Sequence, residues 1–421
     1  MAGESARVVE AAEALGDRFV AMQGLFAFGY SIMLRLRFAD GESAIRRAVA
    51  IAREDEKAYR LTATLSMLAA QVTLQGRSRE AGPLFEQARS LNPAFRDTIL
   101  VELEAFARWM AGDFTGAVSA AQEAAAWTPG GARRRAFGLA CGGLAAAETG
   151  DTREAERLLG RARDALGGRD WAYFLLYTRY GEAVLAWHAG RPAECAAALA
   201  EVTASLRGMG ALAVSVFALI DLAESAADAH DGNAAASAAR QLEDVASIAD
   251  LAPHRGLAAA AASWAALESS ELHVAVAQAT EAVDLLSEAG WRSHLARAHD
   301  VLGRSLAAAG RPGAVAELER AAAIFADCGA AWRRDRTVQV LRRLGSSGRR
   351  AAAATLGPAS LTRREREVAR LAARGMSAKA IAAALFVGER TVESHLSSTY
   401  AKLGVESKLD LIRRAAELGL S

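Results

Sequence analysis

The sequence is poor in cysteine, proline and aromatic residues, and these shortages exclude several classes of protein. Its three cysteines lie more than 50 residues apart, which excludes a local metal knuckle or redox pair. The chain has only seven prolines among its 421 residues, and 52% of all residues are hydrophobic. This composition excludes a disordered or fibrous chain. No apolar run reaches the ~18 residues of a membrane span, and the N-terminal residues do not resemble a secretory signal peptide. We therefore expect a globular, cytoplasmic protein of bacterial type that makes no membrane contact.

Lysine is also scarce, and charge is unevenly distributed. The chain contains four lysines, of which three lie in the last 43 residues. Residues 333–421 hold 18 Lys plus Arg against 8 Asp plus Glu, a net charge of +10, so the preceding 332 residues carry −9. The overall charge of +1 thus hides an acidic body and a basic C-terminal region. Such a region is typical of a surface that meets phosphate, and a solvated surface without a partner is the alternative.

Motifs of catalysis and of cofactor binding are missing. The sequence has no Gly-x-x-x-x-Gly-Lys-Ser/Thr phosphate loop, His-Glu-x-x-His, Gly-x-Ser-x-Gly or dinucleotide fingerprint. His294 and His299 are five residues apart and would point to different faces of a helix, which disfavours a metal site between them. We expect no cofactor, no bound metal and no enzymatic activity.

A repeated helical pattern fills residues 1–344. Apolar residues recur at i, i+3, i+4 and i+7, and a helix repeatedly ends at a glycine before an Ala-rich helix begins. Glycine tolerates the left-handed geometry of a helix end, and one helix pair cannot bury its own apolar face. We therefore predict an all-α solenoid of stacked pairs, which resembles degenerate tetratricopeptide repeats; an irregular helical bundle is the alternative. Clear turns begin at Gly76, Gly112, Gly150 and Gly190, weaker ones at Gly232 and Gly310, and further candidates are Gly41 and Ser270.

The densest aromatic stretch lies near the middle of this region. Tyr173, Tyr177 and Tyr180 would share one helical face, where they are candidates for a ligand or peptide groove. Packing between repeats is the alternative use of such a stripe.

A second region follows a segment rich in Gly, Ser and Pro. That segment predicts a flexible linker at 345–360. Beyond it, Thr362 and Glu365 form a capping-box pattern that opens a helix to about residue 374. Further helices are predicted at 378–385, at 389–402, and from 408 to about 418, which gives a four-helix domain over 361–421.

Residues 361–420 resemble the LuxR/GerE-type helix-turn-helix domain of bacterial transcription regulators. The resemblance is carried by the opening Leu-Thr-Arg-Arg-Glu-Arg-Glu-Val, by Gly-Met-Ser before the second helix, by Thr-Val-Glu-Ser-His-Leu in the third, and by Lys-Leu-Gly-Val. It implies a sequence-specific, DNA-binding transcriptional regulator. Larger, MalT-like members place an ATPase module ahead of helical repeats, and this sequence shows no motif of that module.

The resemblance also implies roles for individual residues. The helix at 389–402 would enter the major groove of double-stranded DNA. Glu393 departs from the lysine frequent at this position in the family; it can accept a hydrogen bond from a cytosine amino group, and a merely solvated charge is the alternative. The residues expected to face bases are Glu393, Ser394 and Ser397, and those expected to reach phosphates are Lys379, Arg390, Thr391, His395 and Lys402.

Specific binding by so small a domain usually needs two half-sites and a two-fold dimer. The fourth helix is rich in apolar residues, and we expect a homodimer contact on DNA there, with Leu411 off the face shared by Leu409 and Ile412. The alternative is that these residues only close the domain core.

RNA polymerase, or a protein or small-molecule effector, would be a further partner. A protein-interaction scaffold whose terminal domain mainly dimerises remains the alternative function. The candidate contact residues are Leu409, Leu411, Ile412 and Leu418.

Overall fold

The computed structural model describes residues 2–55, 57–91, 98–126, 132–167, 172–344, 361, 363–385 and 387–420. Within these ranges the chain forms 22 helices and no strand, so the all-α prediction is confirmed. The chain divides into two compact units, Met1–Thr337 and Val338–Ser421. The linker predicted at 345–360 and Thr362 of the predicted capping box lie outside the described residues.

The first unit is an array of helices joined by short turns, and α18 runs across its C-terminal boundary. Their bounds are α1 (Ala2–Leu15), α2 (Arg18–Met33), α3 (Phe38–Arg53), α4 (Ala58–Leu74), α5 (Ser78–Leu91), α6 (Thr98–Ala111), α7 (Phe114–Ala126), α8 (Ala132–Thr149), α9 (Thr152–Leu166), α10 (Ala172–His188), α11 (Pro192–Gly208), α12 (Leu212–Asp228), α13 (Gly232–Ala249), α14 (Ala252–Glu268), α15 (Leu272–Ser287), α16 (Arg292–Ala308), α17 (Ala314–Asp327) and α18 (Ala331–Arg343).

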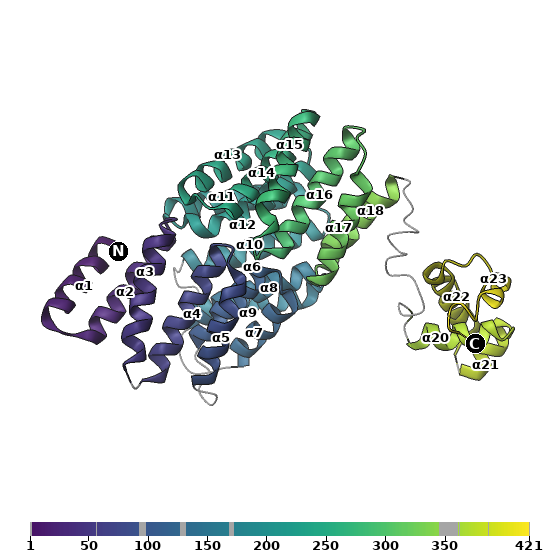
Figure 1. The fold of residues 1–421 in the computed structure, drawn as a ribbon, viewed down its shortest axis with the longest axis horizontal. Helices are drawn as coiled ribbons and strands as arrows, with labels where there is room; N and C mark the ends of the chain where they lie inside the picture. Colours follow the sequence, from purple (N-terminus) through teal and green to yellow (C-terminus); the bar gives the residue numbers. More distant parts are fainter. Residues whose placement is uncertain are drawn as a thin grey trace. The chain divides into compact units, whose positions relative to one another are not determined.

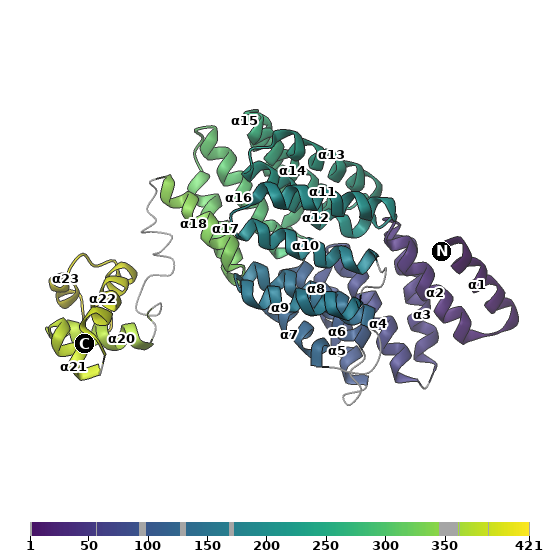
Figure 2. The same ribbon diagram turned by 180° about the vertical axis from the view of Figure 1, so that it is seen from behind.

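The helices form an inner and an outer layer. Even-numbered helices pack on one another from α4 to α10 and again from α12 to α16, and each odd-numbered helix from α5 to α17 packs on the even-numbered helix before it. In Figure 1 and in the reverse view of Figure 2, α11 to α15 run as a second row beside α4 to α9. This arrangement is the predicted solenoid of stacked helical pairs.

A residue in the left-handed conformation ends the first helix of each pair and sets the repeat. The predicted turns at Gly76, Gly112, Gly150, Gly190, Ser270 and Gly310 are confirmed, with φ between 60° and 83°. Those at Gly41 and Gly232 are wrong by five and two residues, because the left-handed residues are Leu36 (φ 68°) and His230 (φ 57°). Glycine is favoured at such a position because it lacks a Cβ, but packing of the array holds other residues there.

The shifted turns carry another signal in the sequence. A charged residue follows every one of the eight left-handed residues, including Leu36 and His230. Where it is aspartate, its carboxylate caps the next helix: Asp151 accepts a hydrogen bond from the Glu154 amide at 3.0 Å, and Asp231 accepts one from the Ala234 amide at 2.9 Å. The charged residue after the turn therefore marks the repeat more reliably than the glycine.

The solenoid winds back onto itself. The indole Nε1 of Trp291 donates to the Thr73 carbonyl at 2.7 Å, so the start of α16 touches the end of α4. The Ala213 amide donates to the Leu34 carbonyl at 3.0 Å, which joins α12 to α2 in the same way. Trp291 is fully buried. Helices more than 170 residues apart thus share one core.

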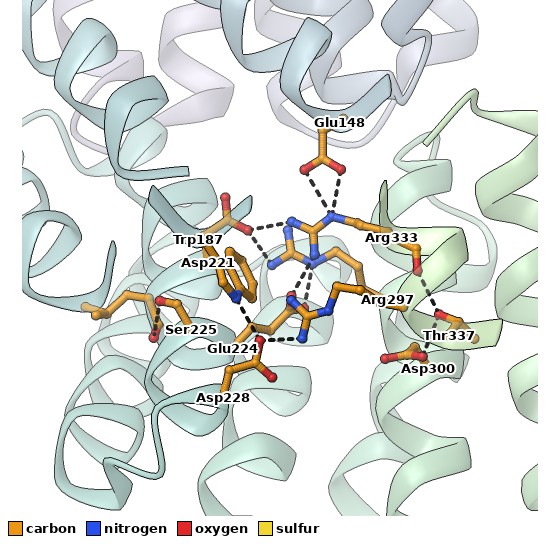
Figure 3. A network of polar contacts seen from close by, with 12 residues as sticks. Glu148, Trp187, Asp221, Glu224, Ser225, Asp228, Arg297, Asp300, Arg333 and Thr337 are labelled. Carbon is orange, nitrogen blue, oxygen red and sulfur yellow. Dashed lines mark hydrogen bonds and ion pairs between the residues drawn. The ribbon is translucent and has the colours of Figure 1, made fainter. Parts of the chain in front are cut away.

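Five buried charged residues meet inside this closed array (Figure 3). Arg333 of α18 donates through Nε to both carboxylate oxygens of Glu148 (3.0 and 2.8 Å), and its other nitrogens donate to Glu224 at 2.7 Å and Asp221 at 2.9 Å. Arg297 of α16 donates to Glu224 at 2.7 Å and pairs with Asp221 at 2.6 Å. All five are at most 7% exposed. We call Glu148, Asp221, Glu224, Arg297 and Arg333 the buried charge cluster.

The electrostatics of the buried charge cluster depend on its two guanidiniums. Burial by itself would raise the pKa of the Glu224 carboxyl, but the positive charges of Arg297 and Arg333 outweigh burial and lower that pKa to about 2. Glu224 is therefore ionised at every pH at which the protein works. Removing either arginine would leave buried carboxylates without sufficient positive charge.

The second unit contains α20 (Arg363–Ala373), α21 (Ala378–Leu385), α22 (Glu389–Leu403) and α23 (Lys408–Arg413). Ser377 caps α21 by accepting from the Ala380 amide, and Ser407 caps α23 by accepting from the Asp410 amide, both at 3.2 Å. The predicted fourth helix is too long: α23 ends at Arg413, and hydrogen-bonded turns continue from there to Gly419, which has φ 62°. Val368, Ile381, Val392, Leu411, Leu418 and Leu420 belong to its core.

Candidate functional site

Helix α22 presents two contrasting faces. Val392, Thr399 and Leu403 are at most 4% exposed and anchor the helix in the core of the second unit. A helix repeats every 3.6 residues, so the side chains on the opposite face of the helix from these anchors point outward. Glu393, Ser394 and Ser397 are all exposed, as predicted for residues that face a partner.

The cationic and polar residues expected to meet phosphates differ in accessibility. Lys379 on α21 and Arg390 and Thr391 on α22 are exposed, and His395 is half-buried. Among the residues that the structure describes, Lys379 and Arg390 make no ion pair and therefore have their full charge available. They stand on the two helices that a helix-turn-helix motif uses against DNA.

Lys402 is engaged within the domain instead. Its Nζ lies 2.7 and 2.6 Å from the two carboxylate oxygens of Glu365 on α20, and the Glu365 side chain is 8% exposed. A partly buried ion pair of this kind fixes α22 against α20. The prediction of Lys402 as a phosphate contact is therefore corrected: its charge is already neutralised by a buried carboxylate.

Other basic residues of the unit also hold its turns together. The Nζ of Lys408 donates to the Gly375 carbonyl at 2.7 Å, and Arg414 donates to the Gly404 carbonyl at 3.1 Å. Both acceptors lie just after the end of a helix, where carbonyl groups lack partners within the helix. These roles were not predicted from the sequence, and the glycine that ends each helix is the signal that points to them. Some of the positively charged side chains in residues 333–421 thus stabilise the fold of the second unit.

The residues proposed for a dimer contact separate into two sets. Leu411 is fully buried and Leu418 is 8% exposed, so both belong to the domain core and neither can form a contact between subunits. Leu409 is 58% and Ile412 is 38% exposed. The predicted dimer contact was therefore wrong for Leu411, because α23 turns that side of the helix onto α20, and for Leu418, which lies in the turn after α23 and packs in the same core. Leu409 and Ile412 remain available to a partner.

The three tyrosines also separate. Tyr173 and Tyr177 line one pocket of the first unit, and their hydroxyl oxygens lie 3.1 Å apart. Tyr180 points elsewhere: its hydroxyl oxygen lies 2.6 Å from the Asp221 carboxylate, to which it donates, and 2.9 Å from the Phe217 carbonyl oxygen. Tyr180 therefore supports the buried charge cluster and does not line a groove with the other two.

Neither a membrane span nor a metal cluster is found in the part of the chain that the structure describes. No helix there combines the length and the apolar character that a bilayer crossing requires. Likewise, no group of three or more His, Cys, Asp or Glu side chains is arranged to hold a metal ion.

The second unit is similar to known regulators. Residues 359–415 match the luxR family of bacterial regulatory proteins. Spore germination protein GerE of Bacillus subtilis is 39% identical over 59 residues, which cover 14% of this chain and 80% of GerE. An HTH-type transcriptional regulator of Mycobacterium tuberculosis is 51% identical over 63 residues, 15% of this chain, and that match spans only 7% of the relative's length.

The first unit is similar to a solved helical-repeat structure. A crystal structure of a Rap protein complexed with competence and sporulation factor superimposes with a TM-score of 0.50 and 10% sequence identity. The superposition covers 78% of this chain and 99% of the Rap chain. At this identity the likeness shows the fold alone, a helical solenoid of comparable extent.

Proposed function

Because this chain belongs to the luxR family of bacterial regulatory proteins, we propose that it is a transcriptional regulator that binds double-stranded DNA and has no enzymatic activity. In this proposal α22 enters the major groove, and the repeat region receives a signal. The observation that carries it is the outward face of α22, where Glu393, Ser394 and Ser397 are exposed while the opposite face is buried in the core.

The test is binding of the full chain to the DNA upstream of its own gene. A gel-shift titration at two salt concentrations is expected to give a retarded band whose affinity falls as salt rises, because phosphate contacts release counterions. An unrelated duplex of equal length is the control. Equal affinity for both duplexes, or no retardation at low salt, would favour the scaffold function instead.

The first prediction concerns phosphate contacts. Lys379→Ala or Arg390→Ala is expected to weaken binding to all duplexes alike, because a phosphate contact carries no sequence information. Each variant should also lower the slope of log K against log salt by about 1. Arg413→Ala is the matched control, since Arg413 is exposed in the same unit but lies on α23. A variant that lost only specific binding would contradict the assignment.

The second prediction concerns base reading. If Glu393 accepts a hydrogen bond from cytosine, Glu393→Lys is expected to change the preferred base pair at one position of each half-site, by about 1–3 kcal/mol of discrimination. Selection of binding sites from a random duplex pool measures this for both proteins. The same consensus from both would assign the reading to Ser394 and Ser397 and leave Glu393 a solvated charge.

Two copies on DNA complete the proposal. A two-fold dimer matches two half-sites about one helical turn apart and supplies the specificity that one small domain lacks. Leu409 and Ile412 are the exposed apolar side chains of α23 and form its proposed contact. The proposed partner of the repeat region is an effector or RNA polymerase, in line with the Rap structure, which holds competence and sporulation factor.

A further inference from the structure

A pocket of about 190 Å³ lies in the inner layer of the first unit. Six helices, α2, α4, α6, α8, α10 and α12, contribute its walls. It exists because the solenoid closes: α12 reaches α2 through the bond between Ala213 and Leu34, and Val214 adds to the wall beside that bond. Phe106 and Tyr177 are at most 5% exposed, whereas Phe26 and Tyr30 are half-buried, so the pocket runs from a partly open rim to a buried floor.

Aromatic rings make this pocket a slot. The rings of Phe137 and Tyr177 are almost perpendicular, at 88° with centroids 4.8 Å apart, and Phe106 packs on Phe137 at 5.2 Å. Tyr173 stands at 75° to Tyr177 with centroids 5.6 Å apart. Edge-to-face walls of this kind are rigid and present both ring faces and ring edges. They fit a flat molecule, and a cavity of about 150 Å³ already holds benzene.

Three tyrosine hydroxyl groups and the carboxyl group of Glu102 supply the polar part of the pocket. The hydroxyl oxygens of Tyr173 and Tyr177 lie 3.1 Å apart and form a hydrogen-bonded pair, and Tyr30 lines the same pocket. Burial raises the pKa of each hydroxyl well above its usual value, so all three stay neutral. The bond between Tyr173 and Tyr177 uses one hydrogen of the pair. A hydroxyl both donates and accepts, so the pair can also bond to a polar group of a ligand.

The lining also determines what charge the pocket accepts. None of its sixteen lining residues is Lys, Arg or His, so an anionic molecule would be buried without a counter-ion. One acidic residue, the buried Glu102, also lines the pocket and would disfavour an anion further, and the rest of the lining is aromatic or aliphatic, with residues such as Met67 and Leu103. Pockets of this composition, apolar with a few convergent polar groups, are typical of small-molecule sites.

We propose that this pocket binds a small, flat, uncharged aromatic molecule of one or two rings that carries one hydroxyl or comparable hydrogen-bonding group. The rings of the ligand lie against Phe106, Phe137 and Tyr177, and its polar group bonds to the hydroxyl pair of Tyr173 and Tyr177. The inference deepens the proposed function, in which the repeat region receives a signal, and names the chemical class of that signal.

The test uses 2-naphthol as probe and the full chain as protein. Isothermal titration calorimetry is expected to show one site for 2-naphthol, weaker binding of naphthalene, which lacks the hydroxyl, and no binding of 2-naphthoate, which is charged. Tyr173→Phe should weaken 2-naphthol binding about 5- to 10-fold and change naphthalene binding less than about 2-fold, because only a hydrogen bond is removed.

A second variant tests whether the site is this pocket. Ala70 is 2% exposed and lines the wall, so Ala70→Phe should fill the space and abolish binding of both neutral probes. Ala200→Phe is the matched control, on the exposed side of α11. If Ala70→Phe fails to fold, Tyr173→Phe still decides the result. Absence of 2-naphthol binding, or binding unchanged in Tyr173→Phe, would overturn the inference. DNA binding is measured in a separate experiment, so a negative result with 2-naphthol would not contradict the proposed binding to DNA.

Discussion

Arg333→Ala is expected to lower the free energy of unfolding of the first unit by about 3–5 kcal/mol, the range found when one partner of a buried ion pair is removed. The guanidinium of Arg333 contacts Glu148, Asp221 and Glu224, and without it these three buried carboxylates face Arg297 alone. The side chain also brings α18 against α8 and α12, so its loss affects three helices together (Figure 3).

Urea unfolding followed by tryptophan fluorescence measures this effect. All seven tryptophans lie between residues 109 and 332, so the signal reports on the first unit alone. Arg334→Ala is the matched control, because the side chain of the neighbouring Arg334 is 42% exposed and, among the described residues, forms an ion pair with Asp335 alone. A surface pair of that kind contributes about 1 kcal/mol at most. A cost below 1 kcal/mol for Arg333→Ala would contradict the role assigned to the buried charge cluster.

The same variant should show a distinct pH dependence. In the native protein the pKa of Glu224 is about 2, below its value in the unfolded chain, so its ionisation stabilises the fold above about pH 4 and that contribution is lost as pH falls through 2. Without Arg333 the pKa values of the carboxylates rise, and protonation relieves their repulsion. The difference in the free energy of unfolding between the variant and the native protein should therefore shrink as the pH is lowered from 7 to 5. A difference independent of pH would contradict this.

Leu411→Arg is expected to unfold the second unit. Leu411 is fully buried in the core that Val368, Ile381 and Leu418 share, and a guanidinium there loses water without gaining a partner. The cost is about 4 kcal/mol or more, against the ~3–9 kcal/mol that about 60 residues typically provide. Both specific and non-specific DNA binding should disappear, while tryptophan fluorescence of the first unit stays unchanged.

Leu409→Arg is the matched substitution on the same helix. Leu409 is 58% exposed, so the unit should stay folded, with hydrogen exchange of residues 363–420 as slow as in the native protein. If Leu409 forms the dimer contact, this variant loses cooperative occupancy of a probe with two half-sites and still binds a single half-site. Preserved cooperativity would move the contact between subunits away from α23. Slow exchange in Leu411→Arg would contradict the placement of Leu411 in the core.

The sequence by itself determined the elements and the kind of function. Periodic apolar residues and left-handed turns are local features, so they identified the helical pairs at Gly76, Gly112, Gly150 and Gly190 without knowledge of the fold. The motifs of the second unit were equally local, as are the caps that the structure shows at Ser377 and Ser407. Each depends on interactions within about one helical turn, which a linear pattern records.

Only the tertiary structure decided which residues meet across the solenoid. A small rotation between successive pairs accumulates along the array, and no single repeat records the sum. That sum brings Trp291 onto Thr73, and Arg333 onto Glu148 across 185 residues. The same limit applies within the second unit, where the sequence shows that Lys402 is charged but not that Glu365 holds it. Helical periodicity shows that Leu409 and Leu411 lie on different sides of α23, but it does not show which side faces the core. The packing of α23 against α20 decided that Leu411 points inward and Leu409 outward.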